Sequence, residues 1–167
     1  MTSRPRWAHV ISVLGAVATV GLAWWLFPTD ARRVRAACHE LAASLSAPPR
    51  QSEVARLARL AQLARHLAPE VSVEAEGLDT RIEGRDQAVT LAGRLDPTPA
   101  GRTVTLEDLH VAIGEDRRSA DVDTVVVVGE PDASGGPDNV ERRQVTMVWA
   151  KTQDGWRLAR AVVLIPD

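Results

Sequence analysis

Apolar and polar residues alternate with a period of two near the end of the chain. Between residues 144 and 164 the apolar members are Val145, Met147 and Trp149 before a Gln153-Asp154-Gly155 sequence, and Trp156, Leu158, Val162 and Leu164 after it. Alternation around an Asp-Gly pair is typical of a β-hairpin. An isolated hairpin is only marginally stable in water, so the rest of the chain is expected to pair with it or cover it.

Earlier segments carry apolar residues at helical spacing instead. In residues 31–46 these are Val34, Ala37, Cys38, Leu41 and Leu45. In residues 52–67 they are Val54, Leu57, Ala61, Ala64 and Leu67, with Arg56, Arg59, Gln62 and His66 on the opposite side. A third, shorter segment opens near Glu83 and has Ala88, Leu91, Ala92 and Leu95. Each pattern predicts an amphipathic helix that buries its apolar side.

Strand patterns fill the remaining segments. Residues 71–76 predict a short strand, and residues 103–113 and 120–128 predict two long strands joined by a turn. Residues 125–128 are four consecutive valines, which is typical of a strand covered on both faces. With the closing hairpin this makes four long antiparallel strands in a meander. We therefore expect an α+β fold in which helices pack on one face of a strongly bent antiparallel sheet.

The N-terminal segment predicts a membrane anchor. Residues 7–27 contain no charged residue and, as a helix, would span roughly 30 Å, enough to cross a bilayer. Trp7 stands at one end, and Trp24, Trp25 and Phe27 stand at the other, where interfacial aromatic residues belong. We expect residues 1–28 to be a tail and transmembrane helix, and residues 29–167 to be one folded domain.

Two alternatives bear on this segment. Arg4 and Arg6 also suit the charged start of a cleavable signal peptide, and Gly21-Leu22-Ala23 suits its cleavage site, which would release a secreted domain. The apolar run continues through residues 24–27, which favours an uncleaved anchor. Arg4 and Arg6 favour a cytoplasmic N-terminus and an extracytoplasmic domain, whereas the arginines of residues 32–35 favour the reverse. We expect a single-pass membrane protein with an extracytoplasmic domain and contact with lipid.

Charge and composition exclude some classes of function. The net charge is −2, and residues 69–167 carry 11 basic and 19 acidic side chains. This acidic excess, with no tyrosine and one phenylalanine, argues against nucleic acid as a partner. Cys38 is the only cysteine, so no intramolecular disulfide can form.

The order of elements and several short motifs resemble the nuclear transport factor 2-like superfamily, which includes SnoaL-like and ketosteroid-isomerase-like proteins. The matching pieces are the two leading helices, Ile82-Glu-Gly-Arg-Asp-Gln-Ala88, the Asp108–Val128 hairpin and Trp149-Ala-Lys-Thr-Gln-Asp-Gly-Trp-Arg-Leu-Ala-Arg160. The resemblance covers about Ala31 to Ile165. It implies a cone-shaped α+β barrel with a pocket between the helices and the concave sheet, and often a dimer formed through the sheet. Some family members are enzymes and many are binding or assembly modules, so the fold alone assigns no chemistry.

Asp108 and His110 are the catalytic candidates that the sequence offers. They stand two apart on one predicted strand, so they share a face, and a carboxylate could orient the imidazole as a general base. Leu109, Val111 and Ile113 fill the other face, so the pair could equally face solvent or a partner subunit. The tyrosine that isomerases of this family typically use as an oxyanion donor has no counterpart here. The scattered histidines predict no metal site, and no motif predicts a cofactor.

Three hypotheses follow. The first is a membrane-anchored, non-enzymatic interaction or assembly domain, forming a homodimer through its sheet or serving as a subunit of another membrane complex. The second is a small-molecule carrier or an enzyme of the isomerase or hydrolase type that uses Asp108 and His110 inside the cone. The third is a secreted domain released by cleavage after Ala23.

Overall fold

The computed structural model describes residues 29–76, 81–94, 101–130 and 139–164. The described residues form helices α2 (Asp30–Leu45), α3 (Glu53–His66) and α4 (Arg85–Arg94). The strands are β1 (Leu67–Ala75), β2 (Arg81–Glu83), β3 (Thr103–Ile113), β4 (Ser119–Glu130), β5 (Asn139–Thr152) and β6 (Gly155–Leu164). The expected α+β class is confirmed.

The predicted anchor, with Trp7, Trp24, Trp25 and Phe27, lies outside the described residues. Within the described ranges, none of the helices has the length and apolar character needed to cross a membrane.

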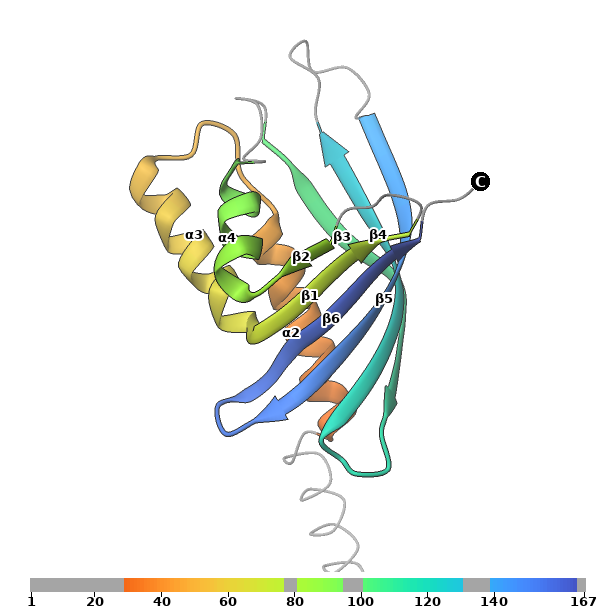
Figure 1. Cartoon of the computed structure of the whole chain (residues 1–167). Coiled ribbons are helices and arrows are strands. Elements are labelled where there is room, and N and C mark those ends of the chain that lie inside the picture. Colours follow the sequence, from red (N-terminus) through yellow and green to blue (C-terminus); the bar gives the residue numbers. More distant parts are fainter. Residues whose placement is uncertain (1–28, 77–80, 95–100, 131–138, 165–167) are drawn as a thin grey trace, which may run out of the picture.

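The strands form one sheet in the order β2-β1-β6-β5-β4-β3. The antiparallel meander of β3 to β6 is confirmed. The expectation of a purely antiparallel sheet is wrong, because β1 runs parallel to β6 and pairs on its other side with β2. The sheet is also open rather than a closed barrel, with β2 and β3 at its edges (Figure 1). Parallel pairing of distant strands leaves no local pattern, so the sequence did not reveal it.

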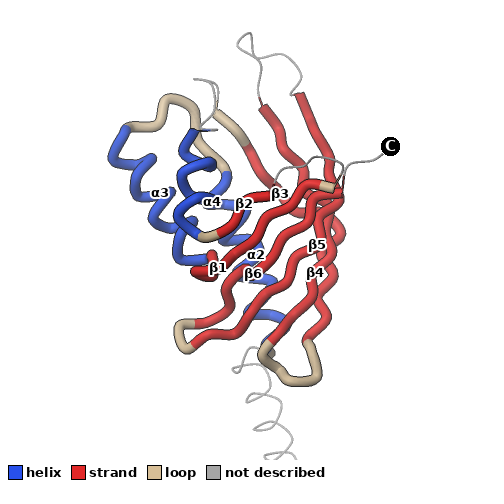
Figure 2. Tube along the Cα trace, viewed as in Figure 1, coloured by secondary structure: helices blue, strands red, loops and turns tan. Residues whose placement is uncertain are grey.

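All three helices cover the same face of the sheet (Figure 2). The core lies in the layer between them, and its side chains of zero exposure include Val34 and Cys38 of α2, Val71 of β1, Val122 of β4 and Trp149 of β5. The α2 positions follow from the helical spacing, and the strand positions follow from the period of two.

The closing hairpin forms as predicted, with its two-residue turn at Gln153 and Asp154 and Gly155 at φ 119°. On β5 the inward residues Val145, Met147 and Trp149 are buried. On β6 the predicted inward residues Trp156 and Leu158 are buried, but the prediction is wrong for Val162 and Leu164. Trp149 pairs with Leu158 while Val148 pairs with Arg160, so Ala159 is an extra residue that shifts the alternation. Ala161 and Val163 therefore point inward in place of Val162 and Leu164.

The expected orientation of α3 is also wrong. Val54 and Leu57, predicted to be buried, are 78% and 56% exposed, whereas Arg59 is only 7% exposed. Leu63, at i+4 from Arg59, is buried on the same side. Burial of the guanidinium is tolerated because its Nη1 donates to the carbonyl of Ser44 at 3.3 Å. Because Arg59 is charged, its side of α3 looked polar in the sequence although it is buried. The side with Val54 and Leu57 looked buried although it is exposed.

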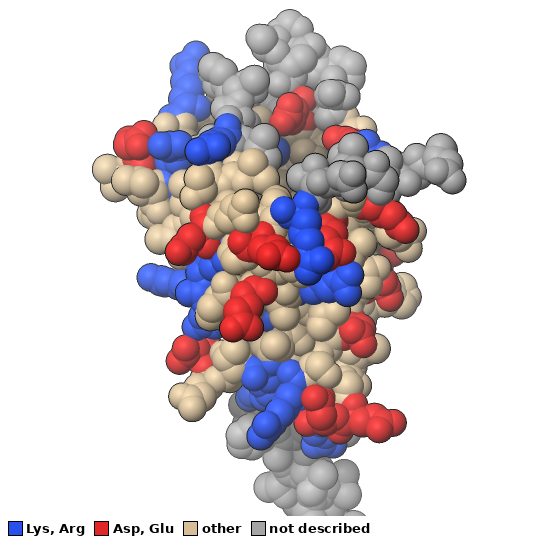
Figure 3. Space-filling view, viewed as in Figure 1, with Lys and Arg blue, Asp and Glu red and all other residues tan. Residues whose placement is uncertain are grey.

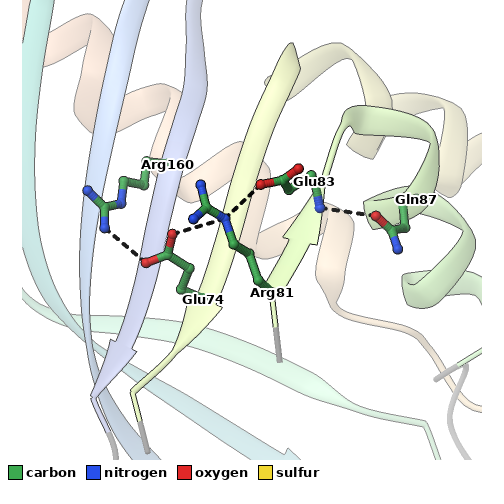
Figure 4. Close-up of polar contacts among 5 residues, drawn as sticks. All are labelled: Glu74, Arg81, Glu83, Gln87 and Arg160. Atoms are coloured by element: carbon green, nitrogen blue, oxygen red, sulfur yellow. Dashed lines mark hydrogen bonds and ion pairs between the residues drawn. The ribbon is translucent and has the colours of Figure 1, made fainter. Parts of the chain in front are cut away.

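A chain of polar contacts joins β6, β1 and β2 (Figure 4). The Glu74 carboxylate lies 2.9 Å from Nη2 of Arg160 and 3.3 Å from Nε of Arg81. Arg81 also lies 2.8 Å from Glu83, whose backbone N–H donates to Oε1 of Gln87 in α4. Both arginines are more than half exposed, so each pair contributes well under about 1 kcal/mol. These polar contacts mainly fix the register of β2, the short edge strand, against β1.

Candidate functional site

An apolar cavity lies between the helices and the concave face of the sheet. Its volume is about 350 Å³, within the range of small-molecule sites, roughly 300–1,000 Å³. Its apolar lining includes Leu41, Leu45, Leu63, Ala88, Leu91 and Ala92 from the helices, and Val104, Leu106, Val126, Val128, Val145, Met147, Leu158, Ala161 and Val163 from the strands. The layer between helices and sheet is therefore hollow, although each lining position follows the pattern of a filled core.

Arg102 is the one charged residue among the described residues that line the cavity. Its Nε and Nη2 donate to the carbonyl of Leu45 at 3.3 and 3.2 Å, which satisfies the last turn of α2. A backbone bridge between Arg102 and Ala47 holds the two segments together. Gly101 precedes Arg102 at φ 87°, and a Cβ there would lie 2.8 Å from the Ala47 carbonyl oxygen. The sequence analysis missed Arg102, because an arginine after a loop carries no pattern of its own.

Cys38 contributes the only thiol to this lining. Its side chain has zero exposure. Burial raises the pKa of the Cys38 thiol to about 12, so it stays protonated near neutral pH. A protonated thiol is a poor nucleophile, and Cys38 acts here as a small apolar side chain.

The predicted pair Asp108 and His110 does not reach the cavity. Asp108 has a φ of 52° and lies in a bulge of β3 that turns Leu109 toward the core. Both side chains of the pair are exposed. The structure does bring them together, but through the backbone: Nδ1 of His110 lies 2.9 Å from the carbonyl oxygen of Asp108. Neither side chain is among the described residues that line the cavity, so the pair is not in a position to act on a molecule bound there.

His66 ends α3 beside Glu40 of α2, with 3.8 Å between Nε2 and the carboxylate. A position at the C-terminal end of a helix would by itself favour an imidazolium, through the helix dipole. Instead, burial lowers the pKa of His66, outweighing the opposite effect of Glu40. Within the described ranges, no group of three or more His, Cys, Asp or Glu side chains is placed to hold a metal ion.

Charged side chains are mixed over the surface seen in Figure 3, where acidic and basic groups alternate across helices and strands. The described side chains on this face form no continuous basic stripe of the kind that follows a nucleic-acid backbone. The candidate site is therefore the apolar cavity, and the Arg102 guanidinium is the charged group among the described residues of its lining.

No protein-family model matches the chain, and no curated protein matches its sequence. Solved structures do match its fold. A nuclear transport factor 2-like protein with a cystatin-like fold from Novosphingobium aromaticivorans has a TM-score of 0.65 at 14% identity, with 91% of this chain and 88% of that chain covered.

Two further structural neighbours differ in what they are described to do. One is a candidate calcium/calmodulin-dependent protein kinase II association domain from Xanthomonas campestris, with a TM-score of 0.64 at 16% identity, covering 84% of this chain and 91% of that chain. The other is a candidate scytalone dehydratase from Novosphingobium aromaticivorans, with a TM-score of 0.62 at 14% identity, covering 79% and 80%. At these identities the likeness shows the nuclear transport factor 2-like fold alone.

Proposed function

We propose that this chain is a membrane-anchored, non-enzymatic domain that binds an apolar small molecule in its cone. The observation that carries the proposal is the cavity of about 350 Å³ lined almost entirely by aliphatic side chains. Burying an apolar ligand there gains roughly 25 cal/mol for each Å² removed from water. Arg102 is the charged residue among the described residues of this lining.

Catalysis is not part of this proposal. A general base has to lie within hydrogen-bond reach of the reacting group. Among the described residues that line the cavity, Arg102 and Cys38 carry the polar side chains, and neither is a base at neutral pH. The dehydratase description of one structural neighbour therefore has no matching acid–base pair in the described part of this cavity.

The membrane part of the proposal comes from the sequence. The uncharged run of residues 7–27, with Trp7, Trp24, Trp25 and Phe27 at its ends, supports a single-pass anchor. Helix α2 begins at Asp30, so only two residues would separate the domain from the membrane surface. The folded domain, residues 29–167, would then sit on the extracytoplasmic side.

A cavity-filling variant tests the ligand proposal. The full chain in lipid nanodiscs is titrated with a neutral fluorescent apolar probe, with empty nanodiscs as the reference. We expect about one probe per chain for the native protein and loss of binding for Ala92→Phe, whose ring would occupy the cavity. Ala112→Phe, at an exposed position of β3, is the matched control and should bind like the native protein. Native binding no greater than that of empty nanodiscs would overturn the proposal, and so would undiminished binding by Ala92→Phe.

Assembly through the outer face of the sheet is the second candidate function, because one structural neighbour is described as an association domain. Val125, Val148 and Val162 on that face are half-buried rather than fully exposed. Sedimentation of the full chain in detergent tests this candidate. We expect a dimer that Val148→Glu dissociates, and a strict monomer at all concentrations would rule it out.

A further inference from the structure

The outward side of α3 is unusually apolar. Among the described residues only three large hydrophobic side chains are exposed, and two of them, Val54 at 78% and Leu57 at 56%, lie on this helix. Ala58 and Ala61 continue the same side at helical spacing and are also exposed. We call Val54, Leu57, Ala58 and Ala61 the α3 stripe.

The α3 stripe cannot turn into the core of its own molecule, because the opposite side of the helix is fixed. Arg59 donates to the Gln51 side chain and to the Ser44 carbonyl. Leu60 lies against Gly93 of α4. A Cβ added to Gly93 would lie only 3.2 Å from Cδ1 of Leu60, so the two helices are closely packed at this point. Exposure of the α3 stripe therefore follows from how α3 packs on α2 and α4.

The two halves of the α3 stripe are complementary in shape. Val54 and Leu57 project, whereas Ala58 and Ala61 are small and border a surface groove whose other walls are Glu40, Gln62, Arg65 and His66. The projecting residues precede the small ones along the helix. An antiparallel copy of the same helix would bring the projecting half of each stripe over the small half of the other.

Charge favours the same arrangement. The first turn of α3 carries Glu53, which also pairs with Arg56 at 3.0 Å, and its last turn carries Arg65. An antiparallel pair places the acidic turn of one helix near the basic turn of the other and aligns the helix dipoles favourably. A parallel pair would bring like charges together.

We propose that the α3 stripe is a contact surface for a second copy of this chain, with the two α3 helices packed antiparallel about a two-fold axis near Leu57 and Ala58. Both halves of the interface lie on one helix, so the surface is self-complementary, as a two-fold contact requires. The proposal does not depend on the cavity or on the outer face of the sheet. A single helix face is smaller than a standard interface of about 1,600 Å², so the contact is weak.

Disulfide cross-linking tests the proposal. The two-fold axis brings the Ala58 positions of the two copies close together, so full-length Ala58→Cys in proteoliposomes should form a disulfide dimer under mild oxidation. The control is Ala112→Cys, which exchanges an exposed alanine for cysteine on β3 at the far edge of the sheet. Native Cys38 is fully buried and should contribute no cross-link in either protein. We expect Ala58→Cys to cross-link roughly tenfold faster than the control, because the contact raises its effective concentration.

A second variant removes the contact and leaves the fold intact. Leu57→Lys in the Ala58→Cys background places two like charges across the two-fold axis. Cross-linking should fall to the rate of the control, while the circular dichroism spectrum and thermal midpoint stay unchanged because Leu57 is exposed. Equal rates for Ala58→Cys and Ala112→Cys would overturn the proposal, as would cross-linking that Leu57→Lys does not reduce. If the thiol of the Ala58→Cys variant is protected from a soluble thiol reagent in a chain that stays monomeric, the proposal is also overturned, since a different occupant would then cover the stripe.

Discussion

Lys151, near the end of β5, donates a hydrogen bond from Nζ to Oδ1 of Asp30, the first residue of α2, across 2.9 Å. The same ammonium lies 5.5 Å from the centroid of the Trp156 ring. The hydrogen bond from Lys151 is the main reason that the pKa of Asp30 is lowered. This contact ties the start of the folded domain to the closing hairpin.

Replacing Lys151 with glutamine should lower the free energy of unfolding by about 0.5–1 kcal/mol, since both partners are partly exposed. The loss should shrink in high salt, which screens the native pair. The contribution of Asp30 should be present above the ordinary carboxyl pKa of 3.8 and lost as the pH falls through the lowered folded value. Denaturant unfolding of Lys151→Gln, Asp30→Asn and the double variant measures the coupling, and a coupling energy of zero would contradict the prediction.

Gly101→Ala should destabilise the domain by about 1–3 kcal/mol. The residue has a φ of 87°, and an added Cβ would lie 2.8 Å from the Ala47 carbonyl oxygen and 2.9 Å from the Pro49 nitrogen. Gly129→Ala is the matched control, because a Cβ there meets nothing within 4 Å, and it should be neutral or slightly stabilising. Chemical denaturation of both variants measures the difference in unfolding free energy. Equal denaturation midpoints would show that the close approach of residue 101 to Ala47 and Pro49 does not require glycine.

His66 should make stability depend on pH near neutrality. Burial lowers the pKa of His66 below its ordinary value of 6.5, so between the two values the unfolded chain binds more protons than the folded one. Stability is then full above pH 6.5 and declines as the pH falls below it. His66→Gln should flatten the stability profile between pH 7 and 5, whereas His39→Gln, at an exposed position, should leave it unchanged. The measurement is the denaturation midpoint as a function of pH, and identical slopes for the two variants would refute this role.

Cys38 should be unreactive in the folded protein. With its thiol fully buried and its pKa raised to about 12, thiolate is almost absent at pH 7. Labelling by iodoacetamide, followed by mass spectrometry, should require unfolding and should speed up by orders of magnitude in denaturant. Rapid labelling of the native protein would mean that the cavity opens to solvent more freely than the structure shows.

Local patterns predicted much of this fold. The spacing of Val34, Cys38 and Leu41 located α2 and its buried side, and the alternation through Met147 and Trp149 located the inward face of β5. These predictions succeed because burial is periodic in a regular helix or strand. They fail where one extra residue shifts the period, as Ala159 does in β6.

The candidate site was harder to predict. Asp108 and His110 are both exposed, because the bulge at Asp108 breaks the alternation of the strand and turns Leu109 toward the core instead. Arg59 shows a different limit, because the hydrogen bonds that its guanidinium donates to Gln51 and Ser44 make a charged residue suitable for a buried position. The cavity could not be predicted from the pattern of apolar residues, since the side chains that line a cavity have the same polarity as those that fill a core.

The parallel pairing of β1 with β6 has a consequence for how the protein is made. Ser72, Val73 and Glu74 pair with residues 160–162, which lie far along the chain from them. During synthesis β1 leaves the ribosome long before its partner exists, so β1 and β6 cannot pair until residues 160–162 have been made. A nascent chain therefore exposes the apolar sides of its helices until β6 has been made, and a premature stop before β6 would yield a product for proteolysis rather than a smaller working domain.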